Sequence, residues 1–397
     1  MTSPHVLVAG AGPTGLVAAA ILARAGIPVT VLEAEVSLPV NLRASTFHPP
    51  TLDMLDELDA AAPLIAQGLR APQLQFRDRT TGLIAAFDFA DIADLTRHPF
   101  RLQCEQFRLN EILLNGLQAF PHADTRFGAA LRSVEEDDDG VTAILEDGER
   151  LRADYLIGAD GANSAVRQSS DIAFEGFTWP ERFLVVSTPF DFTAPFPDLC
   201  LVNYVADPVE WYFLLKVPGL WRVMFPTRPE EEDESILSDA SAQRRMRRVH
   251  DLGEPYVIEH KTLYRVHQRV ADRYRSGRRF LVGDAAHINN PLGGMGMNGG
   301  IHDAHNLAHK LVRVLQGKAP AALLDDYERE RRPVALEYIN KHTIANKRNL
   351  ETADPAAQSA FRDGMRETLA DREKTRAYLK RVSMIASLQQ AEAAARA

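Results

Sequence analysis

The chain has 397 residues, and its 45 lysines and arginines against 54 aspartates and glutamates give a net charge of −9. This balance argues against nucleic acid as a partner, because no excess of positive charge is available to neutralise phosphates. With 45% hydrophobic and 25% charged residues, the composition is that of a globular protein long enough for two or three domains.

The N-terminal segment has the pattern of a strand, a helix and a second strand. Residues 5–9 (HVLVA) form a short apolar run, 13–25 resemble a helix, and 28–32 (PVTVL) form a second run that ends before Glu33. The apolar stretch 16–23 is too short to cross a bilayer and has neither the basic region nor the cleavage site of a signal peptide. We therefore predict a βαβ unit and no transmembrane segment.

Later segments alternate between helical and extended patterns. The sequence predicts helices at 50–58 and 105–118, short strands between 125 and 157, extended segments from 183 to 227, a strand at 280–282 and helices from about 299 onward. The α/β pattern thus occurs at both ends of the chain, with an antiparallel block between them. Two domains woven through each other explain this order better than two consecutive domains.

A glycine-rich motif follows the first predicted strand and opens the first helix. It is Gly10-Ala11-Gly12-Pro13-Thr14-Gly15, a GxGxxG sequence. Gly10 permits a tight turn, Gly12 lets the backbone approach a pyrophosphate, and Gly15 lets the helix pack close to the strand. The helix N-terminus offers N–H groups to phosphates, and Glu33 at the end of the second strand can accept hydrogen bonds from ribose hydroxyls. These features predict a dinucleotide site.

Three motifs in this order resemble those of a known enzyme family. After the first glycine motif, the chain has a DGxxSxxR sequence from Asp160 to Arg167, then a GD pair at 283–284 that leads into 291–298 (PLGGMGMN). Together they resemble the single-component FAD-dependent aromatic hydroxylases, the flavoprotein monooxygenases typified by para-hydroxybenzoate hydroxylase. The segment 327–333 (YERERRP) is also similar to that family, and the likeness runs from about residue 4 to 335.

The resemblance implies an α/β fold with α+β character. A Rossmann-like FAD-binding domain would be interleaved with an antiparallel-sheet substrate domain and followed by C-terminal helices. The discontinuous FAD-binding domain would comprise 1–75, 101–178 and 268–350, the substrate domain 76–100 and 179–267, and the C-terminal helices 351–397.

The resemblance also implies which residues hold FAD. Glu33 would bind the adenosine ribose, and Asp284 would hold the ribityl chain and phosphate. Arg43 and Gln106 would lie along the pyrophosphate and ribityl chain. Asp160, together with Arg167, would serve both FAD and NAD(P)H.

The second glycine-rich segment has a physical reason to bind the flavin ring. It offers consecutive backbone N–H groups leading into a helix, which suit the pyrimidine edge where reduced flavin carries negative charge. Pro291 and the Gly293-Gly294 backbone would face the ring where oxygen reacts. The residues predicted to bind FAD here are Gly293, Gly294, Met295, Gly296, Met297 and Asn298.

The implied reaction is hydroxylation of a small aromatic or heteroaromatic compound with NADPH or NADH and O2, through a flavin hydroperoxide. The protein would supply a dry cavity and a group that favours the substrate's phenolate. The alternatives are a related FAD-dependent oxidoreductase of the isoprenoid reductase or halogenase type, and a flavin-binding protein without oxygenase activity. The WxWxIP signature of the halogenases is absent from the sequence, and the intact glycine motifs argue against a loss of chemistry.

The candidate substrate-binding residues come from a predicted β-hairpin. Residues 199–206 and 210–217 can pair through the loop 207–209, with Val202, Tyr204, Tyr212 and Leu214 on one face and Trp211, Phe213, Leu215 and Val217 on the opposite, core face. We therefore predict that Tyr204 and Tyr212 are pocket hydroxyls that orient the substrate or support its deprotonation. Two ordinary strand tyrosines are the alternative.

Several other polar residues have both a functional and a structural interpretation. Arg222 is a candidate for binding an anionic group, with a surface arginine as the alternative, and His287 is expected to make a structural hydrogen bond. The histidines at 302, 305 and 309 recur at helical spacing, but no acidic or cysteine partner is evident in the sequence to complete a site, so no metal is expected.

The cysteines and the C-terminal segment complete the prediction. Cys104 and Cys200 are too few for a disulfide framework, which indicates thiols in a reducing compartment and a cytoplasmic protein. Tyr378, Val382 and Ile385 recur at helical spacing. This helix could form a dimer surface, touch a membrane or pack on its own domain, and the last is the default, so a homodimer is left open.

Overall fold

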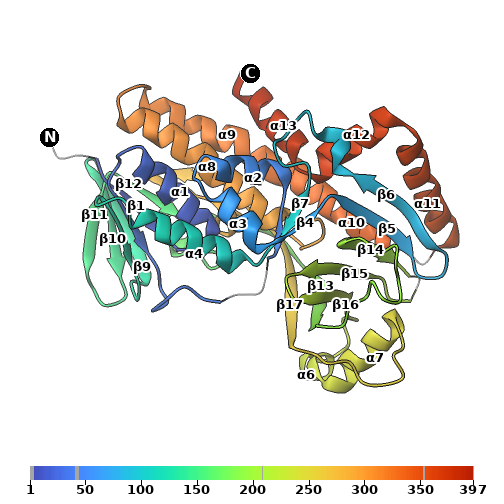
Figure 1. Ribbon diagram of the computed structural model, residues 1–397. Coiled ribbons are helices and arrows are strands. Elements are labelled where there is room, and N and C mark those ends of the chain that lie inside the picture. Colours follow the sequence, from blue (N-terminus) through green and yellow to red (C-terminus); the bar gives the residue numbers. More distant parts are fainter. Residues whose placement is uncertain (1–3, 41–43, 208, 352–353, 397) are drawn as a thin grey trace.

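The computed structural model describes residues 4–40, 44–207, 209–351 and 354–396. The βαβ unit is present, with β1 at Val6–Ala9, α1 at Pro13–Arg24 and β2 at Val29–Leu32. These strands belong to a six-stranded sheet, seen at the left of Figure 1, that is parallel except at one edge. In sheet order its strands are β18 (Arg275–Ser276), β19 (Arg279–Leu281), β12 (Tyr155–Gly158), β1, β2 and β8 (Ala123–Arg126).

The predicted antiparallel block is a second sheet of eight strands, in the lower right of Figure 1. Only the pair β14–β5 is parallel among its described strands. In sheet order they are β20 (His287–Ile288), β17 (His260–Ala271), β13 (Phe174–Thr188), β16 (Leu220–Pro226), β15 (Tyr212–Val217), β14 (Val202–Ala206), β5 (Gln73–Asp78) and β6 (Gly82–Asp88).

Both faces of the eight-stranded sheet are covered, because side chains alternate between two apolar clusters. One face carries Phe183, Tyr204 and Met224, together with helix α12 (Arg372–Val382). The opposite face carries Leu184 and Phe225 under helices α6 (Asp233–Leu237) and α7 (Asp239–Val249), which Figure 1 shows at the bottom of the molecule.

The remaining elements connect and cover these sheets. Two small sheets contain β9 (Leu131–Asp137), β10 (Gly140–Leu145) and β11 (Arg150–Ala153), and β3 (Thr46–Phe47), β7 (Arg101–Gln103) and β4 (Leu69–Ala71). The helices are α2 (Pro49–Asp56), α3 (Ala61–Gln67), α4 (Gln106–Leu117), α5 (Ala165–Ser169), α8 (Met295–Leu315), α9 (Asp325–Pro333), α10 (Asn340–Glu351), α11 (Pro355–Ala370) and α13 (Ile385–Arg396). Short 3-10 turns lie at Phe89–Ile92 (η1), Gly283–Ala285 (η2) and Ala321–Leu324 (η3), and a π-helical turn at Val334–Ile339 (η4).

The predicted fold class, an α/β fold with α+β character and C-terminal helices, is confirmed. The domain boundaries stay predictions, and three of them, at 75/76, 178/179 and 267/268, fall inside β5, β13 and β17. Those strands therefore continue across the predicted division.

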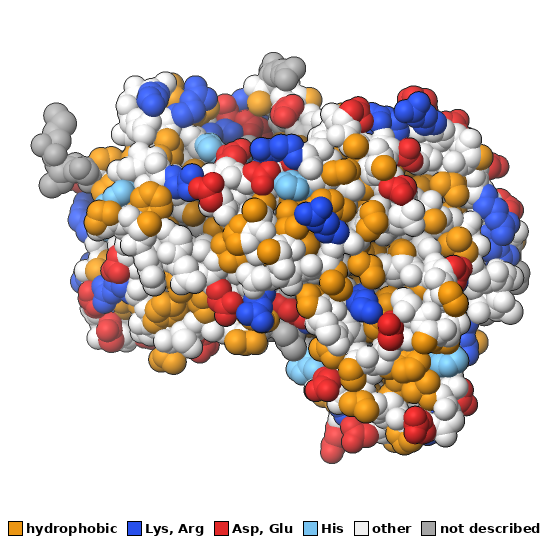
Figure 2. All heavy atoms as spheres, in the orientation of Figure 1, with side chains coloured by type: hydrophobic (Ala, Val, Ile, Leu, Met, Phe, Trp, Pro, Cys, Tyr) orange, Lys and Arg blue, Asp and Glu red, His pale blue; other side chains and the backbone are white. Residues whose placement is uncertain are grey.

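The C-terminal helices pack on the protein's own core. Tyr378, Val382 and Ile385 are all buried, and they belong to the same apolar cluster as one face of the eight-stranded sheet. The default interpretation of this segment is therefore confirmed. No helix in the described ranges is long and apolar enough for a bilayer span. Basic and acidic side chains are interspersed over the face shown in Figure 2.

Candidate active site

Four of the predicted FAD residues lie at one edge of the six-stranded sheet. Gly10 follows β1, Glu33 follows β2, Asp160 lies just beyond β12, and Asp284 lies just beyond β19. Because these strands are parallel neighbours, their carboxyl ends meet at the same edge. Ligands of doubly wound sheets bind at this edge.

The glycine loop has the space that a pyrophosphate requires. Gly10 has φ +102°, and a Cβ there would lie 2.4 Å from the Ala159 carbonyl oxygen. A Cβ on Gly15 would lie 2.0 Å from the Gly10 carbonyl oxygen, so both glycines are required for packing. A Cβ on Gly12 would meet nothing within 4 Å. Gly12 is only partly buried, so this open space lies directly before the N-terminus of α1.

Glu33 is held in place by the glycine loop. Its Oε2 accepts a hydrogen bond from the Ala11 N–H at 2.8 Å, and its Oε1 accepts one from the Glu35 N–H at 3.0 Å. Each carboxylate oxygen can accept a second hydrogen bond. The side chain is thus oriented for ribose hydroxyls beside the phosphate loop.

Thr14 joins the first glycine loop to the GD turn and to α8. A Cβ on Gly283 would lie 2.8 Å from Thr14 Oγ1, and one on Gly300 would lie 2.6 Å from the same atom. Glycine at both positions therefore allows the three segments to touch. Asp284, next to Gly283, is exposed at this junction.

Asp160 is a buried carboxyl with unused hydrogen-bonding capacity. Its Oδ2 accepts from the Val166 N–H at 3.2 Å, whereas its Oδ1 is buried without a partner among the described residues. Burial raises the pKa of Asp160 above its ordinary value. Arg167 nearby donates to the Ala162 and Ala285 carbonyl oxygens at 2.7 and 2.9 Å, so it ties the DG loop to the GD turn.

The second glycine segment begins α8 with two residues in the left-handed region. Gly293 has φ +100° and Gly294 φ +67°, a conformation that L side chains rarely adopt. Gly296 and Met297 are partly exposed in the first turn that follows. Pro291, before this turn, is exposed. The free N–H groups of the turn therefore stand at an accessible helix N-terminus.

Asn298 and Met295 use their side chains inside the protein. Asn298 Nδ2 donates to the Thr46 and Gly294 carbonyl oxygens at 2.8 and 2.7 Å. Its Oδ1 accepts from the His48 N–H at 2.9 Å and the Thr51 hydroxyl at 2.7 Å. All four hydrogen-bonding positions of the amide are thus used. Met295 is buried with side chains of the C-terminal helices, so both residues can reach a ligand only through their backbone.

Gln106 and Arg43 are the two residues predicted to contact the middle of FAD. Gln106 is partly buried at the first position of α4, and its N–H donates to the Ala44 carbonyl oxygen at 3.0 Å. Arg43 lies outside the described residues.

The prediction that Tyr204 and Tyr212 share a face is wrong. Tyr204 pairs with Phe213, and Val205 pairs with Tyr212. Directly opposite residues of antiparallel strands share a face, so the two tyrosines point to opposite sides of the sheet. The predicted loop 207–209 places Tyr212 opposite Tyr204, whereas Tyr212 is paired with Val205. The register therefore differs by one residue, and such a shift moves each side chain to the other face.

The surroundings of the two tyrosines differ accordingly. Tyr204 stacks on Phe76 with ring centroids 5.1 Å apart, on the face that carries α12. Tyr212 lies in the cluster beneath α6 and α7, where burial raises its pKa to about 12. Only Tyr204 faces the cluster that also contains Leu292 of the second glycine segment.

Two other polar residues already have partners in the protein. Arg222 is 5% exposed and donates from Nη2 to both carboxylate oxygens of Glu105, at 2.6 and 2.7 Å. It is therefore neutralised, and neither the surface alternative nor an open anion site fits. His287 shares a 2.7 Å hydrogen bond with buried Asp303, which confirms the structural interpretation.

Sequence reasoning missed a polar group beside the second glycine segment. His48 Nε2 donates to the Gly293 and Gly294 carbonyl oxygens at 2.9 and 3.1 Å, and burial, with a smaller effect of Arg101, holds its pKa well below its ordinary value. Arg101 is 2% exposed on β7, and its Nη1 lies 3.5 Å from the Tyr204 hydroxyl. The only sequence signal was an arginine between the apolar residues Phe100 and Leu102, which by itself indicates no role.

Comparisons with known proteins agree with this geometry. The family described as FAD binding domain matches residues 3–342. The chain belongs to this family. It is 36% identical over 390 residues to para-nitrophenol 4-monooxygenase of Pseudomonas sp. strain WBC-3, with 95% of each chain covered. It is 33% identical over 357 residues to 6-hydroxy-3-succinoylpyridine 3-monooxygenase of Pseudomonas putida, covering 88% of this chain and 90% of that one.

A solved structure is similar over nearly the whole chain. The crystal structure of p-nitrophenol 4-monooxygenase from Pseudomonas putida DLL-E4 has a TM-score of 0.89 and 31% sequence identity, covering 95% of this chain and 98% of that one. The prediction of an FAD-dependent aromatic monooxygenase is confirmed, and the reductase, halogenase and non-catalytic alternatives are not favoured. The open side of Gly12 and the unpaired Asp160 Oδ1 fit FAD as the cofactor.

Proposed function

We propose that this monooxygenase hydroxylates a small phenol that binds as its phenolate, with the phenolate oxygen held by Arg101 and Tyr204. The observation that carries the proposal is the state of Arg101. Its guanidinium is buried, donates from Nη2 to the Val382 carbonyl oxygen at 2.8 Å, and leaves Nε without a partner among the described residues.

Arg101 differs from most buried arginines of this chain. No carboxylate in the described part of the chain forms a salt bridge with it. Other arginines that are less than 9% exposed do form a salt bridge with a carboxylate, namely Arg77, Arg222, Arg245 and Arg331. A buried cation without a counter-charge is costly. An anionic ligand oxygen would remove that cost.

The side chains around Arg101 suit an aromatic ring. Its guanidinium lies 5.7 Å from the centroid of the Phe89 ring, and the neighbouring Tyr204 is stacked with Phe76 and packed against Phe213. Tyr378 of α12 joins the same cluster. Aromatic walls with one convergent polar group are typical of pockets for small aromatic ligands.

His48 links this polar group to the flavin side of the site. Its ring binds the Gly293 and Gly294 carbonyl oxygens and interacts electrostatically with Arg101. Because Nε2 donates, Nδ1 is an acceptor, and it is buried without a partner among the described residues. We infer that His48 stays neutral and accepts a hydrogen bond from a substrate hydroxyl, while Arg101 stabilises the oxygen once its proton has left.

FAD would be held at the carboxyl edge of the six-stranded sheet. We infer that the Gly10–Gly15 loop binds the pyrophosphate, Glu33 the adenosine ribose and Asp284 the ribityl chain. The backbone of residues 293–297 would bind the pyrimidine edge of the ring. When bound, FAD supplies electron transfer from NADH or NADPH and the activation of O2. The chain's residues position the ring of the phenol, favour its ionised form and exclude water.

The relatives' names support a substrate of this class. Two of them are named for hydroxylating para-nitrophenol and pentachlorophenol, which are phenols. We therefore expect a small para-substituted phenol to be the substrate.

The test uses spectral titration of the FAD-loaded enzyme with para-nitrophenol, whose phenolate is coloured, and product analysis after adding NADH or NADPH. We expect the pKa of the bound phenol to fall below its value in water. In Arg101→Met the Kd of the phenolate should rise roughly 10- to 150-fold, because a hydrogen bond to a charged group is worth about 1.5–3 kcal/mol. Equal binding of methyl ethers of the same phenols, or an unchanged Kd in Arg101→Met, would overturn the proposal.

A further inference from the structure

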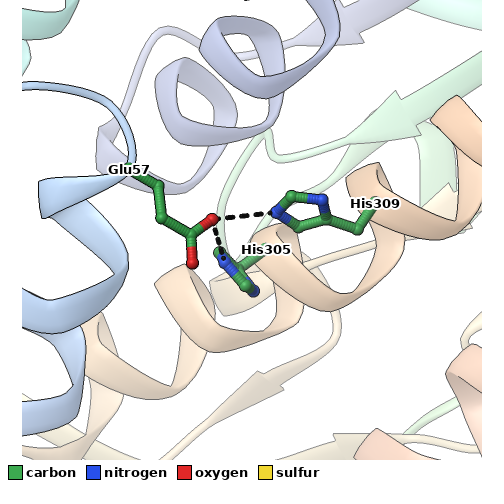
Figure 3. Close-up of side chains that lie close together, drawn as sticks. All are labelled: Glu57, His305 and His309. Carbon is green, nitrogen blue, oxygen red and sulfur yellow. Dashed lines mark hydrogen bonds and ion pairs between the residues drawn. The ribbon is translucent and has the colours of Figure 1, made fainter. Parts of the chain in front are cut away.

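Glu57, His305 and His309 form a cluster outside the flavin and substrate sites. Glu57 directly follows α2, and the two histidines lie one turn apart on α8. Figure 3 shows both imidazole rings directed toward the same carboxylate oxygen. The sequence-based statement that these histidines lack an acidic partner is therefore wrong, because the partner comes from a helix about 250 residues earlier in the chain.

The three side chains present their ligand atoms to one point. Glu57 Oε2 lies 3.0 Å from His305 Nε2 and 3.2 Å from His309 Nε2, and the three ligand atoms lie within 4.8 Å of one another. A tetrahedral zinc ion with bonds of about 2.0–2.1 Å separates its ligand atoms by about 3.3 Å. The two short distances already match this spacing, so only a small side-chain rotation is needed.

We propose that Glu57, His305 and His309 bind one divalent transition metal ion, with zinc as the expected occupant. Imidazole nitrogens with one carboxylate oxygen are the donors that zinc and neighbouring first-row ions prefer, whereas calcium and magnesium prefer oxygen ligands. Three protein ligands leave a fourth position for water. Side chains that are 48%, 21% and 47% exposed, in residue order, give an ion access from solvent.

Neighbouring groups distinguish this cluster from a nearby histidine and from a second cluster. His302, one turn before His305, points inward and shares a 2.9 Å hydrogen bond with Thr51. Asp53, Asp56 and His98 also lie close together, but Arg97 forms salt bridges with both aspartates. Arg97 already compensates the charge of this Asp53, Asp56 and His98 cluster, so the cluster offers a matched control for metal binding.

The position of the cluster gives the ion a structural effect. At its start, α2 is joined to the first turn of α8 through His48 and the Gly293 and Gly294 carbonyl oxygens. Glu57, at its end, faces His305 and His309. A bound ion would thus fasten the second end of the α2–α8 pair. Because the ion binds only the folded protein, it should raise the midpoint of thermal unfolding.

The experiment uses the FAD-loaded enzyme without an affinity tag, freed of metal by a chelator and then titrated with Co²⁺ and separately with Zn²⁺. We expect one equivalent of Co²⁺ to produce visible absorption bands of a four- or five-coordinate site, and Zn²⁺ to displace it and raise Tm by about 3 °C. Glu57→Gln and His309→Asn should each weaken binding at least 10-fold. His98→Asn should bind like the wild type.

The outcomes separate a metal site from a simple hydrogen-bonded cluster. Absence of saturable one-to-one binding in the wild type, or binding that survives in the double variant Glu57→Gln/His309→Asn, would overturn the proposal. Since both variants change partly exposed side chains, their FAD absorbance and metal-free Tm should equal those of the wild type. If the FAD absorbance or the metal-free Tm of a variant differs from wild type, the unmutated enzyme is treated with a histidine-modifying reagent with and without zinc. Zinc should protect His309 from modification, and lack of protection counts against the site.

Discussion

The Thr51 hydroxyl donates a 2.7 Å hydrogen bond to Oδ1 of Asn298. Since its only proton is directed to Asn298, Thr51 must accept from Nε2 of His302, which lies 2.9 Å away. The resulting chain joins two positions of α8, Asn298 and His302, through Thr51 of α2. It fixes the first turn of α8, which we propose to bind the flavin ring.

Replacement of Asn298 should therefore lower both the stability of the protein and its FAD content. Asn298→Ala leaves the His48 N–H and the Thr46 and Gly294 carbonyl oxygens without this partner. Each buried unsatisfied group costs about 1–3 kcal/mol, so we expect the free energy of unfolding to fall by about 3 kcal/mol or more. Urea unfolding and FAD content measure the effect, with the exposed Asn115→Ala on α4 as control. Wild-type stability in Asn298→Ala would contradict the network.

His302 should make stability depend on pH. Burial, the largest effect, and then Arg331 lower the pKa of His302 from 6.5 to about 3. The folded-state pKa is the lower one, so the unfolded chain takes up the proton first as pH falls. Stability is then complete above pH 6.5 and is lost progressively toward pH 3.

Between pH 7 and pH 5 the expected loss of free energy of unfolding from this one group is about 2 kcal/mol. His302→Gln does not titrate and can still donate to Thr51. The difference in pH dependence between wild type and variant, measured by urea unfolding at both pH values, isolates the histidine. Parallel pH profiles would show that His302 carries no such shift.

The glycine loop offers a test that separates folding from cofactor binding. Gly12→Ala adds a methyl group where nothing lies within 4 Å, at a φ of −72° that alanine accepts, so stability without FAD should change by less than about 0.5 kcal/mol. The same methyl would occupy space that we assign to the pyrophosphate, and the Kd for FAD should rise at least 10-fold.

Gly15→Ala is the matched comparison. Its Cβ would lie 2.0 Å from the Gly10 carbonyl oxygen, so this variant should lose stability with or without FAD. Thermal unfolding of the two apoproteins gives their stabilities, and fluorescence titration with FAD gives the Kd of each variant. If Gly12→Ala bound FAD normally, the pyrophosphate would have to lie elsewhere.

The two tyrosines of the hairpin should behave differently. Tyr204→Phe removes the hydroxyl beside Arg101, and we expect the KM for the phenol to rise about 5- to 10-fold, with more NAD(P)H consumed per product. Tyr212→Phe acts on the opposite face and should change neither value. Oxygen uptake combined with product analysis measures the coupling. A larger effect of Tyr212→Phe would restore the register predicted from the sequence.

The meeting of Gly10, Glu33 and Asp284 at one sheet edge could be predicted from sequence because its determinants are local. Gly10, Glu33 and Asp284 each stand at the end of a short apolar strand, and parallel strands bring such ends to one edge. The hairpin was mispredicted because either register leaves apolar residues on both faces of the hairpin. Nothing local distinguishes a register that pairs Tyr212 with Tyr204 from one that pairs it with Val205.

Arg101 and Glu57 could not be assigned a role from sequence for a different reason. The role that we propose for Arg101 depends on its hydrogen bond to the Val382 carbonyl oxygen, 281 residues later. It also depends on the lack of a salt bridge between Arg101 and any carboxylate of the described residues. Glu57 acquires partners only when α2 packs on α8. Such long-range contacts leave no periodic pattern in the residues themselves.

The strand order of the six-stranded sheet also determines how late in translation the sheet can be completed. β1 is bordered by β12 and β2, and β19 joins β12 only about 270 residues after β1 has been made. At about 5–20 residues per second, the ribosome needs roughly 15–50 s to cover that distance. During this interval the first glycine loop lacks the GD turn and α8 that later close around Thr14. We therefore expect FAD to bind late, and prematurely terminated chains to be colourless and prone to degradation.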